Sequence, residues 1–155
     1  MAQVNIGDSR VIESREVSDG LAIRRRRESP DGKRFTTYER IEKPNLAVIK
    51  KKGTRELFSR EKLSSSVHQS VGTFFKSEED VERIVDAVEE ALYALGESEV
   101  TSTQIGNQVL DSLVENNEVA YVRFASVYFD FTNLDEFEEI LVQRREKNAQ
   151  ARKAE

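Results

Sequence analysis

The chain has 155 residues, of which 37 % are hydrophobic and 34 % carry a charge. This length and apolar content are enough for one ordinary domain or two small ones. No apolar run approaches the about 18 residues that a membrane span requires, and residues 1–10 lack the apolar centre of a signal peptide. Since there is also no cysteine for a disulfide framework, we expect a cytoplasmic protein with no membrane partner.

The charge is distributed unevenly, although the formal net charge is only −5. Residues 1–52 contain 13 Lys and Arg against 8 Asp and Glu, and residues 53–155 contain 11 against 21. The first part therefore has a net charge of +5 and the second a net charge of −10. A basic unit of this kind favours nucleic acid, whereas an acidic unit repels phosphate. Chance clustering on a solvated surface is the alternative.

The first 40 residues show an extended pattern. Strands are predicted over 11–17, 21–28 and 33–40, with turns at 18–20 and 29–32. The second turn reads Ser-Pro-Asp-Gly, in which proline presets one backbone angle and glycine supplies a positive one. We expect a three-stranded antiparallel sheet. Its core is so small that it needs help from a metal, a partner or the following domain.

Pro44 and Asn45 break this pattern and mark a domain boundary. A strand is predicted over 46–51, with a turn at Gly53 and a return strand over 55–58. The remainder is predicted to be helical, over about 59–73, 77–96, 101–115, 119–131 and from 134 onward.

Local signals support these helices. Ser59 is a predicted N-cap, and Ser77 with Asp80 resembles a capping box. In the second helix one apolar stripe repeats with helical spacing, formed by Val81, Ile84, Val85, Val88, Leu92 and Leu95. After residue 142 the last helix becomes a charged tail, either a solvated helix end or a frayed one. The domains are thus predicted at 1–43 and 44–142, followed by a tail over 143–155.

The run Arg24–Arg27 lies in the second predicted strand. Because side chains alternate along a strand, two of these arginines project to each face. The planar guanidinium suits both phosphate and guanine edges, without distinguishing DNA from RNA. The alternative is a charged face that pairs with neighbouring glutamates. The candidate nucleic-acid contacts are Arg15, Arg24, Arg25, Arg26, Arg27 and Arg34.

A second basic segment surrounds the predicted hairpin at Gly53. Lys50, Lys51 and Lys52 precede the turn, and Lys62 follows in the first turn of a helix. Free amide groups at a helix N-terminus and nearby ammonium groups both favour a triphosphate. A lysine-rich edge strand is also a common protection against aggregation, and spacing alone leaves both interpretations open.

Several catalytic motifs are missing from the sequence. It contains no G-x-x-x-x-G-K-[ST] or G-x-G-x-x-G segment, and its only histidine is His68, within a predicted helix. Neither a metal site nor a Ser/His or Cys/His nucleophile system is indicated. We therefore expect a binding protein and not an enzyme, with His68 as a partly buried helix residue.

Laid out in this order, the chain resembles the NrdR family of bacterial repressors, which control ribonucleotide reductase genes. The resemblance covers about residues 9–142. Its first part is carried by Val-Ile-Glu-Ser-Arg at 11–15, by Asp19-Gly20, by 24–28 and by Arg-Phe-Thr-Thr-Tyr-Glu at 34–39. The second part resembles an ATP-cone, most specifically in the decapeptide VAYVRFASVY at 119–128. The implied fold class is α+β: a zinc-ribbon-like three-stranded sheet, then a mostly helical ATP-cone with a short β-hairpin.

One departure from the family is large. Its N-terminal unit holds zinc through two cysteine pairs, whereas this chain has a shortened segment at 1–7 and Ser-Pro-Asp-Gly at 29–32. A structural zinc contributes on the order of 10 kcal/mol to a small domain. We expect no zinc here. Our hypothesis is that the Pro-Asp-Gly turn closes the hairpin and that Val4 and Ile6 pack where the first zinc knuckle would lie.

The resemblance also implies a ligand site. Val48, Lys50, Lys51, Glu56 and Lys62 would line it. In physical terms the lysines would face phosphates, Val48 the base, and Glu56 a sugar hydroxyl or the base. ATP and dATP are the expected effectors, with Mg²⁺ beside the triphosphate.

The function implied is a nucleotide-sensing repressor that binds double-stranded operator DNA and forms a homo-oligomer that changes with the nucleotide. The alternative is a nucleotide-gated protein-interaction module that has lost DNA binding. A small nucleotide-using enzyme is a further rival, which the missing catalytic residues disfavour.

Overall fold

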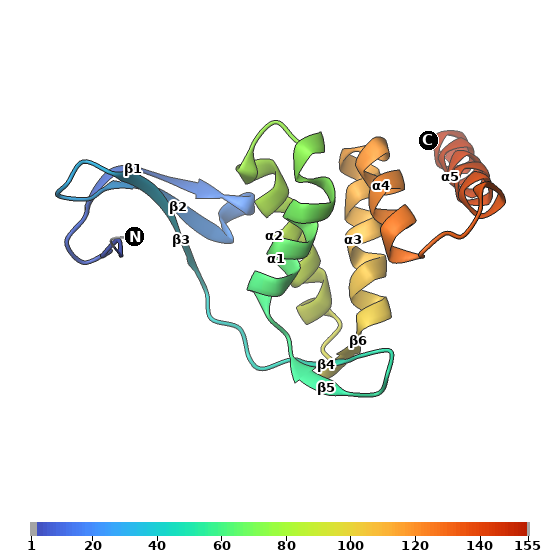
Figure 1. Ribbon diagram of the computed structural model, residues 1–155, viewed down its shortest axis with the longest axis horizontal. Coiled ribbons are helices and arrows are strands. Elements are labelled where there is room, and N and C mark those ends of the chain that lie inside the picture. The colour runs from blue at the N-terminus through green and yellow to red at the C-terminus, as the bar shows by residue number, and fades with distance from the viewer. Residues whose placement is uncertain (1–2, 155) are drawn as a thin grey trace. The chain divides into compact units, whose positions relative to one another are not determined.

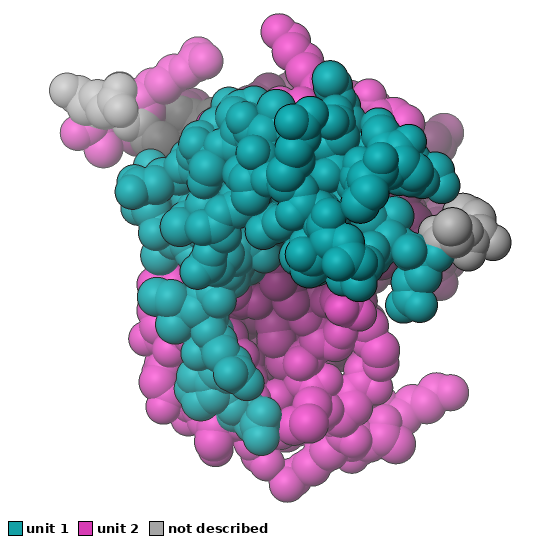
Figure 2. Space-filling model, turned by 90° about the vertical axis from the view of Figure 1, so that its left-hand side faces the viewer, with its two compact units in different colours: residues 1–45 teal, residues 46–155 magenta. Residues whose placement is uncertain are grey.

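The structure, a computed structural model, describes residues 3–154. The chain forms two compact units, divided between Asn45 and Leu46. Figure 1 follows the elements along the chain, and Figure 2 colours the two units separately. The α+β class is confirmed, with an antiparallel sheet in the first unit and mostly helices in the second.

The first unit is the predicted three-stranded sheet. Its strands are β1 (Arg10–Val17), β2 (Ala22–Glu28) and β3 (Arg34–Arg40), in the order β1-β2-β3 with both pairings antiparallel. The turn from β2 to β3 closes as the sequence predicts. The backbone N–H of Ser29 donates to the carbonyl of Lys33 at 2.9 Å, and Gly32 has a φ of +85° that favours glycine.

An ionic clamp ties the three strands together beside that turn. Glu28 of β2 accepts a hydrogen bond from Arg10 of β1 at 2.5 Å and another from Arg34 of β3 at 3.1 Å. The Arg10 and Arg34 hydrogen bonds hold the pKa of Glu28 below its ordinary value. The packing predicted for Val4 and Ile6 is wrong, because these side chains are 42 % and 56 % exposed. Two isolated apolar residues beside so thin a sheet have no core to enter.

The second unit contains a small sheet and five α-helices. Its strands are β4 (Ala47–Ile49), β5 (Arg55–Leu57) and β6 (Glu99–Thr101). Its α-helices are α1 (Arg60–Val71), α2 (Glu78–Ala94), α3 (Ser102–Asn116), α4 (Glu118–Tyr128) and α5 (Leu134–Ala154), and a short 3₁₀ turn, η2 (Gly72–Phe74), follows α1.

The predicted hairpin is one edge of this sheet, whose order is β5-β4-β6. β4 pairs with β5 in antiparallel and with β6 in parallel direction. The sequence analysis missed β6, since three residues with one apolar side chain, Val100, give no periodicity. This strand leads directly into α3, because Thr101 is also the N-cap of that helix.

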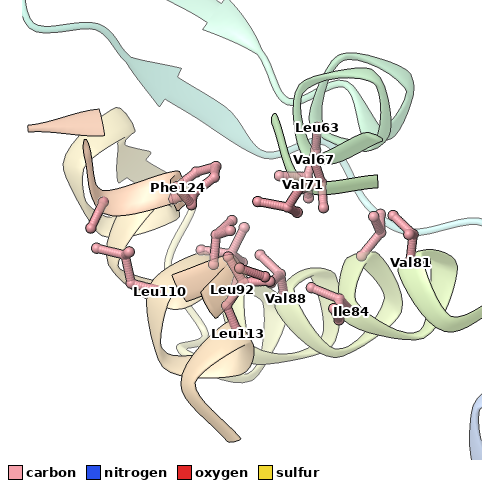
Figure 3. Packing of buried hydrophobic residues seen from close by; sticks show 14 of the residues in the cluster. Leu63, Val67, Val71, Val81, Ile84, Val88, Leu92, Leu110, Leu113 and Phe124 are labelled. Carbon is pink, nitrogen blue, oxygen red and sulfur yellow. The ribbon is translucent and has the colours of Figure 1, made fainter. Parts of the chain in front are cut away.

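A continuous hydrophobic core joins the four helices α1 to α4 (Figure 3). The stripe predicted on α2 is buried from Val81 to Leu92, while Leu95, past the end of the helix, is 45 % exposed. The other helices contribute Leu63, Val67 and Val71 from α1, Val109, Leu110 and Leu113 from α3, and Phe124 from α4. Each fully buried side chain of this size contributes about 1.5–3 kcal/mol.

The helix starts agree with the predicted caps. The Ser59 side chain accepts the N–H of Lys62, and the Ser77 side chain accepts that of Asp80. A reciprocal capping box occurs at Thr101 and Gln104. At the C-terminal end, α5 continues through the segment predicted as a tail, up to Ala154. Within residues 3–154, no helix combines the length and the apolar character that a membrane crossing needs.

Candidate functional site

A surface hollow of about 170 Å³ lies in the second unit, between the β4–β5 hairpin and the beginnings of α1 and α3. Its apolar lining consists of Val48, Leu57, Phe58, Leu63 and Ile105. Its polar lining consists of Lys50, Glu56, Ser59, Lys62, Ser66 and Ser102. Four of the five residues that the resemblance implied for a ligand site are therefore together: Val48, Lys50, Glu56 and Lys62.

The charged groups of this hollow hold one another. Glu56 on β5 faces Lys50 at 3.1 Å and Lys62, in the first turn of α1, at 3.4 Å. The hydrogen bond from Lys50 is the main cause that lowers the pKa of Glu56, and Lys62 lowers it further. Two ammonium groups thus share one carboxylate, which leaves one positive charge in excess.

Two helix N-termini lie at the same hollow. Ser59 caps α1 and Ser102 is the first residue of α3, and both side chains line it. The N-terminal end of a helix carries a partial positive charge and free amide donors. Together with Lys50 and Lys62, these ends favour a polyanion such as a phosphate chain.

The floor of the hollow is apolar. Val48 is buried at the centre of the small sheet, and Phe58 contacts Tyr93 edge to face at 6.3 Å. An aromatic base requires a surface of this kind, next to groups that bind its phosphates.

Lys51 does not line this hollow. Its ammonium nitrogen lies 5.3 Å from the ring centroid of Tyr128, at the end of α4. The Tyr128 hydroxyl donates to the carbonyl of Thr103 at 3.1 Å, so this ring is fixed against α3. Lys51 therefore connects the hairpin to α4.

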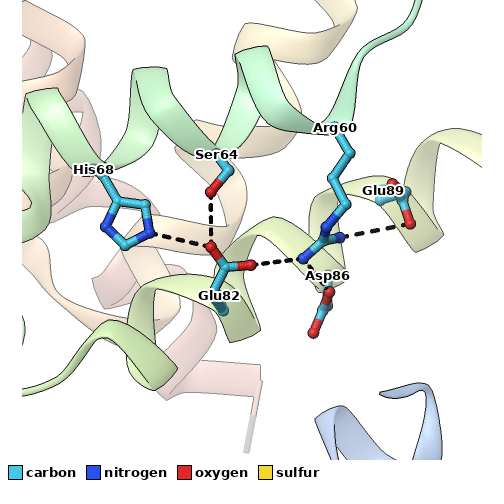
Figure 4. A network of polar contacts seen from close by, with 6 residues as sticks. All are labelled: Arg60, Ser64, His68, Glu82, Asp86 and Glu89. Carbon is cyan, nitrogen blue, oxygen red and sulfur yellow. Dashed lines mark hydrogen bonds and ion pairs between the residues drawn. The ribbon is translucent and has the colours of Figure 1, made fainter. Parts of the chain in front are cut away.

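A polar network fixes α1 on α2 (Figure 4). Arg60, in the first turn of α1, contacts Glu82 at 2.8 Å and the buried Asp86 at 2.6 Å. Arg60 contacts Oε2 of Glu82, whereas Oε1 accepts a hydrogen bond from Ser64 at 2.7 Å and lies 3.1 Å from His68. These contacts hold the end of α1 that frames the hollow.

The network is structural. Burial raises the pKa of Glu82, but the hydrogen bonds of Ser64, His68 and Arg60 outweigh it and keep this carboxylate ionised. Ser64 donates to Glu82 and not to His68, so the two do not form a nucleophile and base pair. The predicted placement of His68 in a helix, partly buried, is confirmed.

The sequence analysis missed this network and the serines of the hollow. Arg60, Ser64 and His68 are spaced by four residues on α1, as are Glu82 and Asp86 on α2, which gives one polar face on each helix. That spacing was the available signal. Ser102 depends on β6, which the sequence pattern did not indicate.

The arginines of the first unit lie on its sheet. Arg25 pairs with Glu39, Arg26 donates to the Thr36 hydroxyl at 2.9 Å, and Arg34 belongs to the Glu28 clamp. Arg27 donates to the hydroxyls of Thr37 and Ser9 at 3.2 and 3.1 Å. Arg15 lies 3.7 Å from Glu13 on the same strand. The side chain of Arg24 makes no hydrogen bond or ion pair in the part of the chain that the structure describes.

Comparison with known proteins assigns both units. Residues 46–134 match the family model "ATP cone domain", and residues 5–39 match "Transcriptional repressor NrdR-like, N-terminal domain". The chain is 46 % identical to the transcriptional repressor NrdR of Streptococcus suis (strain 05ZYH33), over 93 % of this chain and 89 % of that protein. It is 49 % identical to the one of Streptococcus pyogenes serotype M5 (strain Manfredo), over 90 % of this chain and 85 % of that protein.

The chain belongs to the NrdR family. The resemblance found in the sequence is thereby confirmed. The match to the ATP cone makes residues 46–134 a nucleotide-binding domain, and the NrdR relatives are transcriptional repressors, which are regulators and not enzymes.

The N-terminal unit of this NrdR protein does not fit a zinc ion. Residues 1–45 contain neither cysteine nor histidine, so no thiolate or imidazole ligand is present. Among residues 3–154, no group of three or more acidic or histidine side chains has the arrangement of a metal site. The Glu28 clamp and the Ser29–Lys33 turn lie in the region of one missing cysteine pair.

Proposed function

We propose that this protein is a nucleotide-sensing transcriptional repressor that controls ribonucleotide reductase genes. Residues 1–43 would bind double-stranded operator DNA and residues 44–142 would bind ATP or dATP, with residues 143–155 as a charged extension. The nucleotide selects the homo-oligomer that is able to bind DNA. A cytoplasmic location follows from this role.

The arrangement around Glu56 carries the nucleotide part of the proposal. Glu56 lies between Lys50 and Lys62, at the position that a phosphate chain would take. A triphosphate, with Mg²⁺ beside it, replaces one carboxylate by several charged oxygens and also faces the two helix N-termini. Released from the lysines, Glu56 is then able to accept a hydrogen bond from the sugar or the base, which rests on Val48.

The DNA-binding part of the proposal depends on oligomerisation. A single sheet of about 30 residues offers few phosphate contacts and binds weakly. An oligomer presents several sheets at once and raises the apparent affinity through effective concentration. ATP and dATP control the oligomeric state only if each binds one assembly more tightly than the other, and if the assembly that each prefers is different.

Calorimetric titration of the full chain with ATP and with dATP, combined with its mass in solution, tests this function. We expect saturable binding of both nucleotides, an assembly that differs between them, and no phosphate release. Phosphate release would instead support a nucleotide-using enzyme. Two identical assemblies would contradict the switch.

A further inference from the structure

The register of the N-terminal sheet separates its arginines onto two faces. Residues that pair across antiparallel strands project to the same side, and neighbours along a strand project to opposite sides. Arg24 pairs with Arg15 of β1 and with Tyr38 of β3, so these three share one face. Arg25 pairs with Ser14 and Thr37 on the other face.

The side-chain contacts agree with this assignment. On the first face, Glu28 joins Arg10 and Arg34 across the three strands. On the second face, Arg25 reaches Glu39, and Arg27 reaches Thr37. None of these contacts crosses from one face to the other.

The two faces differ strongly in charge. Strand by strand, the first face carries six arginines: Arg10, Arg15, Arg24, Arg26, Arg34 and Arg40. It carries two glutamates, Glu13 and Glu28. The second face carries two arginines, Arg25 and Arg27, and two glutamates, Glu16 and Glu39. The first face therefore has an excess of four positive charges and the second has none.

The run Arg24–Arg27 divides in the same way. Arg25 is neutralised by the carboxylate of Glu39, and Arg27 is held by two hydroxyl groups. On the first face, Arg26 is hydrogen-bonded to one hydroxyl, which leaves its charge uncompensated. The Arg24 guanidinium has neither a hydrogen bond nor an ion pair among residues 3–154. A buried or half-buried guanidinium without a partner is ready to bind an acceptor.

We infer that the sheet binds duplex DNA through its Arg24 and Arg26 face, and that Arg25 and Arg27 have a structural role on the opposite face. This inference rests on the proposed repressor function. Strands lie about 4.8 Å apart, so three of them span about 10 Å, which fits the roughly 12 Å width of the major groove. Arg24 and Arg26 then lie about 6.7 Å apart along β2 and contact phosphates or guanine edges.

Two double variants with the same change of charge test the inference. Arg24→Gln/Arg26→Gln removes two arginines from the first face, and Arg25→Gln/Arg27→Gln removes two from the second. Affinity of the full chain for duplex operator DNA is measured by fluorescence anisotropy over a series of salt concentrations, with the nucleotide that supports binding by the unchanged protein.

The first variant is expected to lose at least about tenfold in affinity, and the magnitude of its salt slope to fall by about two. The second variant is expected to keep the slope and to lose less than about threefold, provided that its sheet stays folded in amide exchange. If the N-terminal sheet unfolds in the second variant, the single variants Arg24→Gln and Arg25→Gln replace the two double variants. Arg24→Gln removes no side-chain hydrogen bond or ion pair of the described residues, so a lower affinity at unchanged thermal stability reports the DNA contact.

The outcomes separate the inference from the function on which it rests. Unchanged protein that binds no DNA under any nucleotide condition overturns the repressor function and the inference with it. Unchanged protein that binds DNA, together with equal losses in the two folded variants, overturns only the assignment of the face. A larger loss of affinity in folded Arg25→Gln/Arg27→Gln than in Arg24→Gln/Arg26→Gln reverses that assignment.

Discussion

At the scale of single residues, the proposed nucleotide site depends on where each lysine near the β4–β5 hairpin points. Lys50 and Lys62 reach Glu56, while Lys51, one residue from Lys50, lies against the Tyr128 ring instead. Both lysines follow β4, which ends at Ile49, and Lys51 lies in the turn that leads to β5, so the conformation of this turn directs the two side chains to different places. Lys50 and Lys51 therefore have different roles, although they are neighbours with the same charge.

We predict that Lys62→Met weakens triphosphate binding more than Lys51→Met does. Hydrogen bonds to charged groups contribute about 1.5–3 kcal/mol, so the loss for Lys62→Met is roughly tenfold or more. Lys51→Met changes the charge equally but removes no group from the lining of the hollow. Calorimetric titration with ATP measures both, and equal losses would show that charge alone, without position, determines affinity.

A second residue-level prediction concerns Glu28 and pH. Since the folded-state pKa of Glu28 lies below its ordinary value of 4.5, the clamp is complete at neutral pH and is lost as the pH falls through that lowered pKa. Glu28→Gln should loosen the strands at pH 7, as seen in the amide spectra of residues 10–40. In this variant the amide spectra should also change less as the pH is lowered, because residue 28 no longer takes up a proton. An unchanged spectrum at neutral pH would mean that the turn alone holds the sheet.

At the scale of elements, α3 and α4 pack closely because Gly106 has no side chain. A methyl group at Gly106 would overlap the Tyr128 ring, and even the hydroxyl oxygen of that ring would lie only 2.7 Å from it. Tyr128 is unable to move away easily, because it is bonded to Thr103 and stacked on Phe124 at 6.0 Å.

Gly106→Ala is therefore predicted to destabilise the ATP cone. In an open helix this change stabilises by about 1 kcal/mol, but overpacking costs about 1–3 kcal/mol and here outweighs the gain. Gly72→Ala is the matched control, since its nearest neighbour would be the His68 ring at 3.9 Å, and it should be neutral or slightly stabilising. Thermal unfolding compares the two, and equal stability would contradict the close contact.

The elements also show what the sequence pattern was able to predict. Long periodic segments such as α2, and turns with proline or glycine such as 29–32, contain their own signals and are found where predicted. β6 has no such signal, because its pairing with β4 depends on residues about 50 positions away. Ser102 lines the hollow because β6 places the start of α3 there. The contact of Lys51 with Tyr128 depends on tertiary packing, which no local sequence pattern predicts.

At the scale of the whole molecule, the two units have opposite net charge, and the proposed regulation requires them to act together. In the proposed function, the basic sheet supplies the DNA contacts and nucleotide binding to the ATP cone supplies the free energy that selects an assembly. Neither unit alone explains regulation. The central claim is therefore that DNA binding by the full chain depends on the nucleotide.

The most direct test of this claim uses a labelled DNA fragment from upstream of the ribonucleotide reductase genes of the same organism. Binding of the full chain is measured with ATP, dATP, both or neither, against a scrambled fragment, after metal analysis of the protein. We predict that binding changes with the nucleotide, weakens steeply with salt and is specific for the upstream fragment. Nucleotide binding without DNA binding under any condition would contradict the repressor and favour a nucleotide-gated module that binds another protein.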